Sequence, residues 1–204
     1  MGHCDWVFAG EKDRVYHDTE WGVPVHNDDR QMFEHLTLEC LQCGLSWGLM
    51  MKKREIFRQC FENFDYDKIA TYDEADIERI LNTEGMLKSE RKVRAVINNA
   101  ICYQRIRGEF GSFCDYLWGY ADGKTVLYEG HAEGAVPVSN GLSDTISRDL
   151  KKRGFKYIGA VTIYSHLQAC GIINDHAFDC PCYTRINETW PTIRLAPDRE
   201  VGQQ

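Results

Sequence analysis

The chain has 204 residues, of which 43% are hydrophobic and 27% charged, the composition of an ordinary globular protein with one core or two small lobes. Its net charge of −7 argues against a generally basic coat for nucleic acid, although local basic clusters occur. No stretch has the apolar length of a membrane span, and the N-terminus lacks the basic and apolar regions of a signal peptide. We therefore expect a cytoplasmic protein without a membrane partner.

Helical periodicity dominates the chain. The first expected helix spans residues 28–43, with Asp28 or Asp29 at its start and Gly44 at its end. Ser46 can cap a second helix over 46–61. Further helices are expected over 65–72, 73–82, 89–107, 112–120, 142–154 and 157–172. The pattern predicts an all-α protein.

Two segments lack this periodicity. Residues 120–140 are rich in glycine and contain Pro137, so we expect an exposed connection there. Periodicity is also lost beyond Tyr183, and residues 184–204 are expected to form a loosely ordered tail. The sequence therefore predicts a single domain over residues 1–183, followed by that tail.

Nine cysteines are many for this length, and in a reducing compartment metal ligation or plain burial is a better explanation than disulfides. A tetrahedral zinc site needs four Cys or His ligands. Cys4 and His17 near the N-terminus, with His176 and either Cys180 or Cys182 near the C-terminus, would supply such a set. The spacing does not choose between the two late cysteines, and burial of free thiols is the alternative.

Glu39 lies within the mostly apolar helix expected over 28–43. A carboxylate in such a place is costly unless it has a partner. It can be a helix cap or half of a buried salt bridge, or it can be a pocket carboxylate that binds a ligand. Tyr16 and Trp47 are equally open to two interpretations, since aromatic residues beside apolar runs usually belong to the core. Two flat rings and a carboxylate are, however, what a flipped purine needs.

Four stretches carry a more specific signal, because they occur in order and at matching spacing: YHDTEWGVP (16–24), LECLQCGLSW (38–47), KKRGFKYIG (151–159) and QACGIINDHAFDCPCY (168–183). Together they resemble the 3-methyladenine DNA glycosylase I family, over nearly all of residues 4–183. The resemblance implies a helix-hairpin-helix fold of two helical lobes. It also implies one structural Zn²⁺ per chain that joins the two ends of the chain.

The resemblance assigns roles to individual residues. It implies zinc ligation by Cys4, His17, His176 and Cys180, and it leaves Cys182 as a bystander. It places the base-binding pocket on Tyr16, Trp47 and Glu39, with Glu39 as the catalytic-site carboxylate that reads the adenine edge. Cys40 and Cys43 stand where family members often have small residues, so this pocket wall is expected to be bulkier.

The segment EGMLKSERK (84–92) is the hairpin that we expect to meet DNA. Gly85 would allow a tight turn and Ser89 would start the next helix, while Lys88, Arg91 and Lys92 would lie near phosphates at the helix N-terminus. The segment lacks the usual Gly-x-Gly core. The alternative is a plain helix–helix turn with a solvated cationic side.

The loop GLSW (44–47) is a second candidate for DNA contact. In the family this loop approaches the base stack at the point where the damaged base leaves. Gly44 and Leu45 are therefore expected to place a small apolar wedge into the gap. The alternative is a helix–helix turn with a buried leucine.

The function implied by the resemblance is a DNA repair N-glycosylase. It would flip 3-methyladenine out of alkylated double-stranded DNA and hydrolyse the bond to the sugar, leaving an abasic site. Between Gly85 and Arg107 the sequence has no aspartate, and it has no isolated lysine suited to Schiff-base chemistry. We therefore expect a monofunctional, monomeric enzyme without a lyase step.

Two other classes of protein remain open at this point. One is a zinc-stabilised lesion- or DNA-binding module without turnover, and the other is a helical scaffold whose cysteines are merely buried. The presence of Glu39 together with Tyr16 and Trp47 favours the enzyme over the binding module.

Overall fold

The computed structural model describes residues 4, 7 and 10–196. This part of the chain is mostly helical, as the periodicity predicts. The helices are α1 (Glu11–Thr19), α2 (Asp29–Gln42), α3 (Trp47–Cys60), α4 (Tyr66–Ile69), α5 (Glu74–Asn82), α6 (Glu90–Phe110), α7 (Phe113–Gly119), α8 (Gly141–Lys152), α9 (Ala160–Ala169) and α10 (Pro181–Thr189), with a 3-10 turn at Glu62–Phe64. Two strands, β1 (Thr125–Tyr128) and β2 (Thr192–Leu195), complete the described elements.

Polar side chains set several helix boundaries. Asp28 begins α2 by accepting a hydrogen bond from the Gln31 amide at 2.9 Å. Asp73 and Asn140 form capping boxes at the starts of α5 and α8. The periodicity does not predict α1 or α10, although Pro181 at the first turn of α10 is a local start signal.

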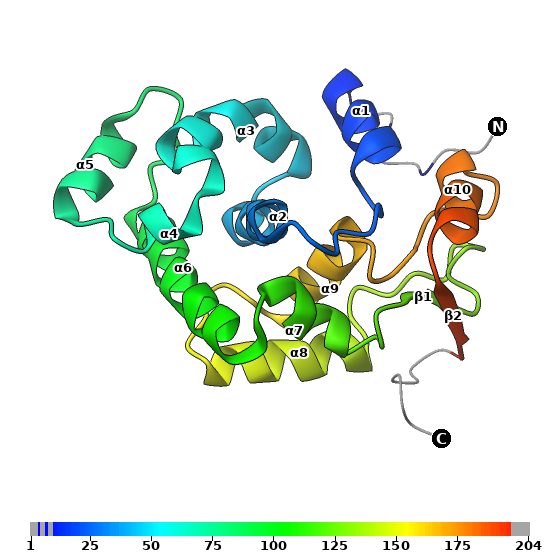
Figure 1. Cartoon of the computed structure of the whole chain (residues 1–204). Helices are drawn as coiled ribbons and strands as arrows, with labels where there is room; N and C mark the ends of the chain where they lie inside the picture. Colours follow the sequence, from blue (N-terminus) through cyan, green and yellow to red (C-terminus); the bar gives the residue numbers. More distant parts are fainter. Residues whose placement is uncertain (1–3, 5–6, 8–9, 197–204) are drawn as a thin grey trace.

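Helix α2 is the central helix of the molecule (Figure 1). All of its residues from 32 to 41 are buried, and α3, α6, α7 and α9 pack around it. A helix that is buried on every side has no position that faces solvent. A charged residue in this stretch must therefore find a partner or change its pKa, and Glu39 is such a residue.

The two segments expected to be irregular contain the sheet. β1 lies within residues 120–140 with all of its residues buried, and it pairs in parallel with β2, Val126 opposite Ile193. The expectation of an exposed connection is therefore wrong for residues 125–128, and a loose tail is wrong for residues 184–195, which form most of α10 and β2. Residues 197–204 of that tail lie outside the described residues.

Segments from both ends of the chain meet on one side of the molecule. Figure 1 shows α1 in blue and α10 in orange on the same side. One Nη atom of Arg185 on α10 donates a hydrogen bond to the carbonyl oxygen of Asp18 on α1 at 2.9 Å.

Among the described helices, none combines the length and apolar content that a membrane crossing requires.

Candidate active site and metal centre

A cavity of about 390 Å³ brings together the three residues singled out for the pocket. Tyr16 comes from α1, Glu39 from the last turns of α2, and Trp47 from the first position of α3. The sequence therefore identifies three side chains that fold onto one cavity from three different helices. The volume is suitable for a small flat ligand such as a purine base.

The two aromatic side chains form one wall of this cavity. The rings of Tyr16 and Trp47 lie 5.2 Å apart between centroids, at an interplanar angle of 43°. The indole nitrogen of Trp47 is buried and has no hydrogen-bond partner among the described residues. A buried donor without a partner is rare in folded proteins, and here a ligand in the cavity could supply the missing acceptor.

Glu39 is the unusual group of this cavity. Its side chain is only 6% exposed, and burial raises the pKa of its carboxyl group from 4.5 to about 8. No described residue forms an ion pair or a hydrogen bond with that carboxyl group, so the alternatives of a cap or a buried salt bridge receive no support within the described chain. The nearby Glu39 adds to the effect of burial in raising the pKa of Tyr16 well above its usual value.

A second acidic residue, Asp175, also lines the cavity and is not among the residues that the sequence indicates. Its carboxylate accepts hydrogen bonds from the Tyr164 hydroxyl at 2.5 Å and from the Gln168 amide at 2.8 Å. Nδ1 of His131 lies 2.7 Å from its other oxygen. Both oxygens of Asp175 are therefore engaged by the protein, which leaves Glu39 as the lining carboxyl group, among described residues, with its oxygens available to a ligand.

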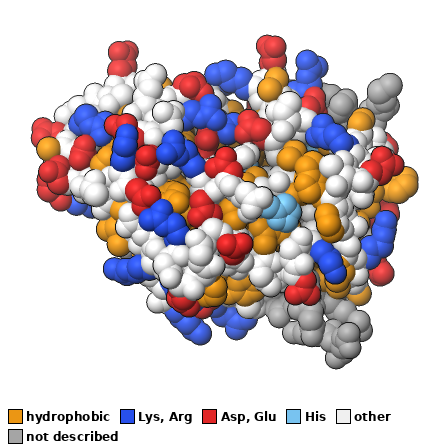
Figure 2. All heavy atoms as spheres, in the orientation of Figure 1, with side chains coloured by type: hydrophobic (Ala, Val, Ile, Leu, Met, Phe, Trp, Pro, Cys, Tyr) orange, Lys and Arg blue, Asp and Glu red, His pale blue; other side chains and the backbone are white. Residues whose placement is uncertain are grey.

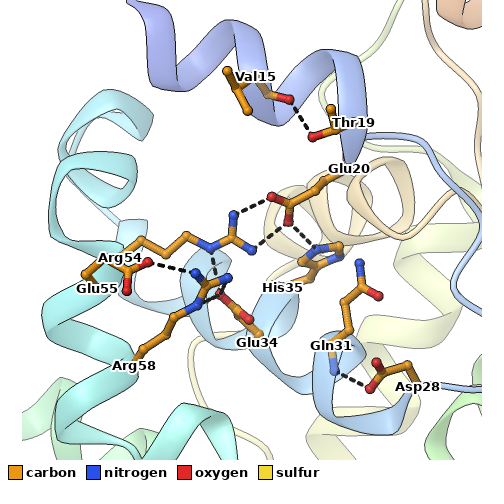
Figure 3. Close-up of polar contacts among 10 residues, drawn as sticks. All are labelled: Val15, Thr19, Glu20, Asp28, Gln31, Glu34, His35, Arg54, Glu55 and Arg58. Carbon is orange, nitrogen blue, oxygen red and sulfur yellow. Dashed lines mark hydrogen bonds and ion pairs between the residues drawn. The ribbon is translucent and has the colours of Figure 1, made fainter.

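A buried ion network joins the helices that carry the pocket residues (Figure 3). The guanidinium group of Arg54 on α3 donates two hydrogen bonds to Glu20, at 2.8 and 2.6 Å, and one to Glu34 on α2 at 2.6 Å. Burial alone would raise the pKa of Glu20, but the nearby His35 imidazole, 3.9 Å away, and the hydrogen bonds from Arg54 lower it to about 2. Arg54 also lies 5.8 Å from the centroid of the Tyr16 ring, so one cation holds α1, α2 and α3 in register around the cavity.

The four residues expected to bind a metal form one cluster: Cys4, His17, His176 and Cys180. Nε2 of His17 lies 3.1 Å from Nδ1 of His176, and the Cys180 sulfur lies 3.7 Å from both of these nitrogens. The Cys4 sulfur lies 3.7 Å from Nδ1 of His176. Around a tetrahedral zinc ion the expected separations are ~3.3 Å for two nitrogens and ~3.6 Å for nitrogen and sulfur, so the donor set fits such an ion.

Neighbouring groups orient both imidazoles of this cluster. Nδ1 of His17 is 2.7 Å from Asp18, which leaves its Nε2 directed to the cluster. Nε2 of His176 is 3.2 Å from the carbonyl oxygen of Trp21, which leaves its Nδ1 for the same purpose. Such partners fix the tautomer of a metal-binding histidine. The Cys182 sulfur lies instead 4.0 Å from the carbonyl oxygen of His17, outside the four-residue cluster.

The expected DNA hairpin is the connection between α5 and α6, and its cations are not all directed to solvent. Gly85 has φ 77°, and a Cβ there would meet the side chain of Ile56, which explains a glycine at this turn. Ser89 is the N-cap residue of α6, and Arg91 is exposed. Lys88 is also exposed, but its ammonium group donates to the carbonyl oxygens at the end of α5.

Lys92 differs from the expectation of a phosphate contact. Its ammonium group donates to the carbonyl oxygens of Leu41 and Cys43, at 2.6 and 2.7 Å. The ammonium group of Lys92 is partly buried, and the loss of hydration lowers its pKa. The cation is therefore occupied at the C-terminal end of α2, and the expectation that it meets DNA phosphate is not what its contacts indicate.

Gly44 and Leu45, the residues expected to form a wedge, lie in the loop between α2 and α3. Gly44 has φ 79°, and a Cβ at this position would meet no atom within 4 Å, so the glycine is explained by the turn and not by crowding. Leu45 is 38% exposed, which does not agree with the alternative of a buried turn residue. The loop adjoins the cavity, because Gln42 and Trp47 on either side of it both line that cavity.

Positive and negative side chains are mixed on the face of the molecule drawn in Figure 2. On the face drawn in Figure 2, the coloured Lys and Arg side chains are interspersed with Asp and Glu rather than gathered in one continuous stripe. This agrees with the net charge of −7. A polyanion that binds to this face would therefore meet cations in local groups.

Comparisons with known proteins agree on one family. The family model described as methyladenine glycosylase matches residues 6–183. The chain is 39% identical to DNA-3-methyladenine glycosylase 1 of Escherichia coli over 183 residues, which are 90% of this chain and 97% of that protein.

Solved structures give the same result. A crystal structure of 3-methyladenine DNA glycosylase I superimposes with a TM-score of 0.83 at 41% identity, covering 89% of this chain and 99% of that one. A tyrosine-to-phenylalanine variant of 3-methyladenine DNA glycosylase I in complex with 3-methyladenine superimposes with a TM-score of 0.82 at 33% identity, covering 89% and 97% of the two chains.

Proposed function

This chain belongs to the methyladenine glycosylase family, and on that premise we propose that it is a DNA repair N-glycosylase specific for 3-methyladenine. It binds alkylated double-stranded DNA as a cytoplasmic monomer, flips the damaged base into the cavity, and hydrolyses the bond between base and sugar. One domain that includes residues 1–183 carries this activity. The proposed architecture is a helix-hairpin-helix fold with two helical lobes.

The observation that carries this proposal is the buried carboxyl group of Glu39 at the cavity and its protonation state. A carboxyl group with a pKa of about 8 keeps its proton near neutral pH while the cavity holds no cation. Methylation at N3 of deoxyadenosine gives the base a positive charge, and a cation beside Glu39 would lower that pKa and favour the carboxylate. Ordinary adenine is neutral, so it gains no comparable electrostatic attraction to the Glu39 carboxylate. The cavity therefore discriminates by charge between the lesion and the normal base.

The chemistry needs little acid catalysis, because the cationic base is already a good leaving group. As the bond between C1′ and N9 breaks, its electron pair neutralises the charge of the base, and a water oxygen bonds to C1′ and releases its proton to solvent. Glu39 contacts the adenine edge, while Tyr16 and Trp47 hold the ring by stacking and cation–π attraction. The products are free 3-methyladenine and an abasic site.

Zinc is the metal that we propose for the Cys4, His17, His176 and Cys180 cluster. Bound there, it would join the N-terminal segment to the loop before α10 as a structural ion, one per chain. Four protein ligands leave no open coordination position, so every chemical step is assigned to the cavity residues. Separations near the tetrahedral values support the assignment.

DNA contact is proposed at two places. The loop with Gly44 and Leu45 fills the gap that the flipped base leaves in the stack. The turn with Gly85, Lys88 and Ser89, together with exposed Arg91, meets the phosphate backbone. Because only a few cations are proposed to contact phosphate, we expect modest affinity with a shallow dependence on salt concentration, each contact adding about one to the slope.

We further propose that the enzyme is monofunctional. The segment between Gly85 and Arg107 contains no aspartate, and neither Lys88 nor Lys92 stands alone in an apolar setting, since both ammonium groups donate to carbonyl oxygens. A Schiff base needs an available amine. Incubation of the protein with methylated DNA and borohydride should trap no covalent adduct, and a trapped adduct would refute this part.

The experiment that tests the proposed function compares wild type with Glu39→Gln in single-turnover release of base from methylated duplex DNA. Glu188→Gln, at an exposed position on α10, serves as the charge-matched control. We expect release by wild type and control, and a loss of about a hundredfold or more in Glu39→Gln, since removing one key electrostatic group has that effect. No release by zinc-loaded, folded wild type would instead favour a lesion-binding module without turnover.

A further inference from the structure

Lys92 makes a long-range contact that the proposed function does not use. It lies in the first turn of α6, yet its ammonium group reaches the carbonyl oxygens of Leu41 and Cys43, about 50 residues earlier in the chain. The two distances, 2.6 and 2.7 Å, are those of strong charge-assisted hydrogen bonds.

The end of α2 needs such a partner. The last carbonyl groups of a helix have no partner within the helix, and together they carry a partial negative charge that a cation stabilises. The last turn of α2 contains no basic residue. Within that turn, Gln42 accepts from the Leu45 amide at 2.6 Å, and Lys92 supplies from another helix the cation that α2 lacks.

The same end of α2 carries the groups on which the proposed function depends. Glu39 and Gln42 line the cavity from the last turns of the helix. The wedge loop with Gly44 and Leu45 begins directly after Cys43, whose carbonyl oxygen is one of the two acceptors. A shift of these carbonyl groups would therefore move the cavity wall and the wedge together.

We propose that Lys92 is a positioning residue that fixes the C-terminal end of α2, and through it the Gly44–Leu45 loop, in the geometry needed to replace a flipped base. The proposal rests on the proposed function for the role of that loop. It changes the role of Lys92 from a phosphate contact to an internal one. The matched contrast is Arg91, the exposed cation one position earlier.

The salt dependence of DNA binding separates the two roles. A lysine that neutralises a phosphate contributes about one to the slope of log affinity against log salt concentration. We expect Arg91→Met to reduce that slope by about one and Lys92→Met to leave it unchanged. A slope reduced in Lys92→Met as much as in Arg91→Met would overturn the proposal.

Base release gives the functional readout. Lys92→Met should lower single-turnover release of base from methylated duplex DNA roughly tenfold to a hundredfold, which corresponds to the loss of hydrogen bonds from a charged donor. The loss should be smaller on methylated single-stranded DNA, because a single strand has no base stack in which the wedge must fill a gap. Lys124→Met, at an exposed site outside cavity and loop, is the neutral control. Equal losses of release on duplex and single strand would contradict a role in placing the wedge.

Amide hydrogen exchange tests the positioning itself, independently of activity. In Lys92→Met the amides of residues 43–46 should exchange roughly tenfold faster or more, while the amides in the middle of α2 keep their wild-type rates. If wild type released no base but the loop still exchanged faster in Lys92→Met, the proposed function would fall and the positioning would stand. Unchanged exchange in the loop would overturn the positioning.

Discussion

Replacing Glu39 by glutamine should make this protein more stable while it removes activity. The amide is nearly isosteric with the protonated carboxyl group but cannot ionise. In the wild type, burial holds the pKa of Glu39 at about 8 instead of 4.5. The folded state thus keeps a proton that the unfolded chain releases.

The sign and size of the effect follow from these two values. Below pH 4.5 both states of the wild type carry the proton, and the full stability is present. Between pH 4.5 and about 8 the unfolded chain ionises first, so the free energy of unfolding falls by about 1.4 kcal/mol per pH unit. At about pH 7 the free energy of unfolding of the wild type is lower by about 3 kcal/mol for this reason. Glu39→Gln should not have this loss, so its melting temperature should be roughly 6–12 °C higher.

The assay is thermal or urea unfolding of wild type and Glu39→Gln at several pH values between about 5 and 8.5, a range that spans the ionisation of the carboxyl group, with saturating zinc in all samples. The matched control is Glu34→Gln on the same helix, since its carboxylate accepts from Arg54 and Arg58 and its loss should destabilise the fold. A stability difference between wild type and Glu39→Gln that does not grow over the lower part of this range would refute the reasoning, as would a less stable glutamine variant.

Three further predictions concern the metal, the wedge and the ion network. Chelation, or His176→Ala, should lower the melting temperature by roughly 10 °C or more and reduce activity in parallel; activity lost with an unchanged melting curve would indicate a catalytic metal instead. Leu45→Ala should slow base release from duplex DNA about tenfold without changing the melting temperature beyond a degree or two. Equal release rates in Leu45→Ala and wild type would refute the wedge role of Leu45. Arg54→Met should cost about 3 kcal/mol in urea unfolding, because it leaves Glu20 and Glu34 with fewer partners; a loss below about 1 kcal/mol would mean that the network is weakly coupled to the fold.

The sequence predicts the helices well where local signals are strong. The expected 73–82 and 89–107 correspond to α5 and α6, because Asp73 and Ser89 mark their starts and apolar spacing marks their buried faces. The sheet could not be predicted in this way. β1 and β2 are short and far apart in the chain, and their pairing depends on α10 returning the chain beside β1.

The site shows the same division between local and long-range information. Tyr16, Glu39 and Trp47 stand out because their motifs resemble those of a known family, and the structure places all three at one cavity. The role of Asp175 could not be predicted from the sequence, although its position beside His176 is a hint that it is buried. Lys92 is expected at DNA because it lies near a helix N-terminus, where phosphates bind, whereas its actual acceptors are carbonyl oxygens on a distant helix and at the start of the loop that follows it.

The most direct test of the account is to identify what wild-type protein releases from methylated duplex DNA. Chromatography and mass spectrometry of the free bases, with an assay for abasic sites and strand breaks in the same DNA, cover substrate and reaction together. We predict free 3-methyladenine, one abasic site for each base released, and no strand cleavage. Absence of 3-methyladenine among the products of folded, zinc-loaded protein would contradict the central claim.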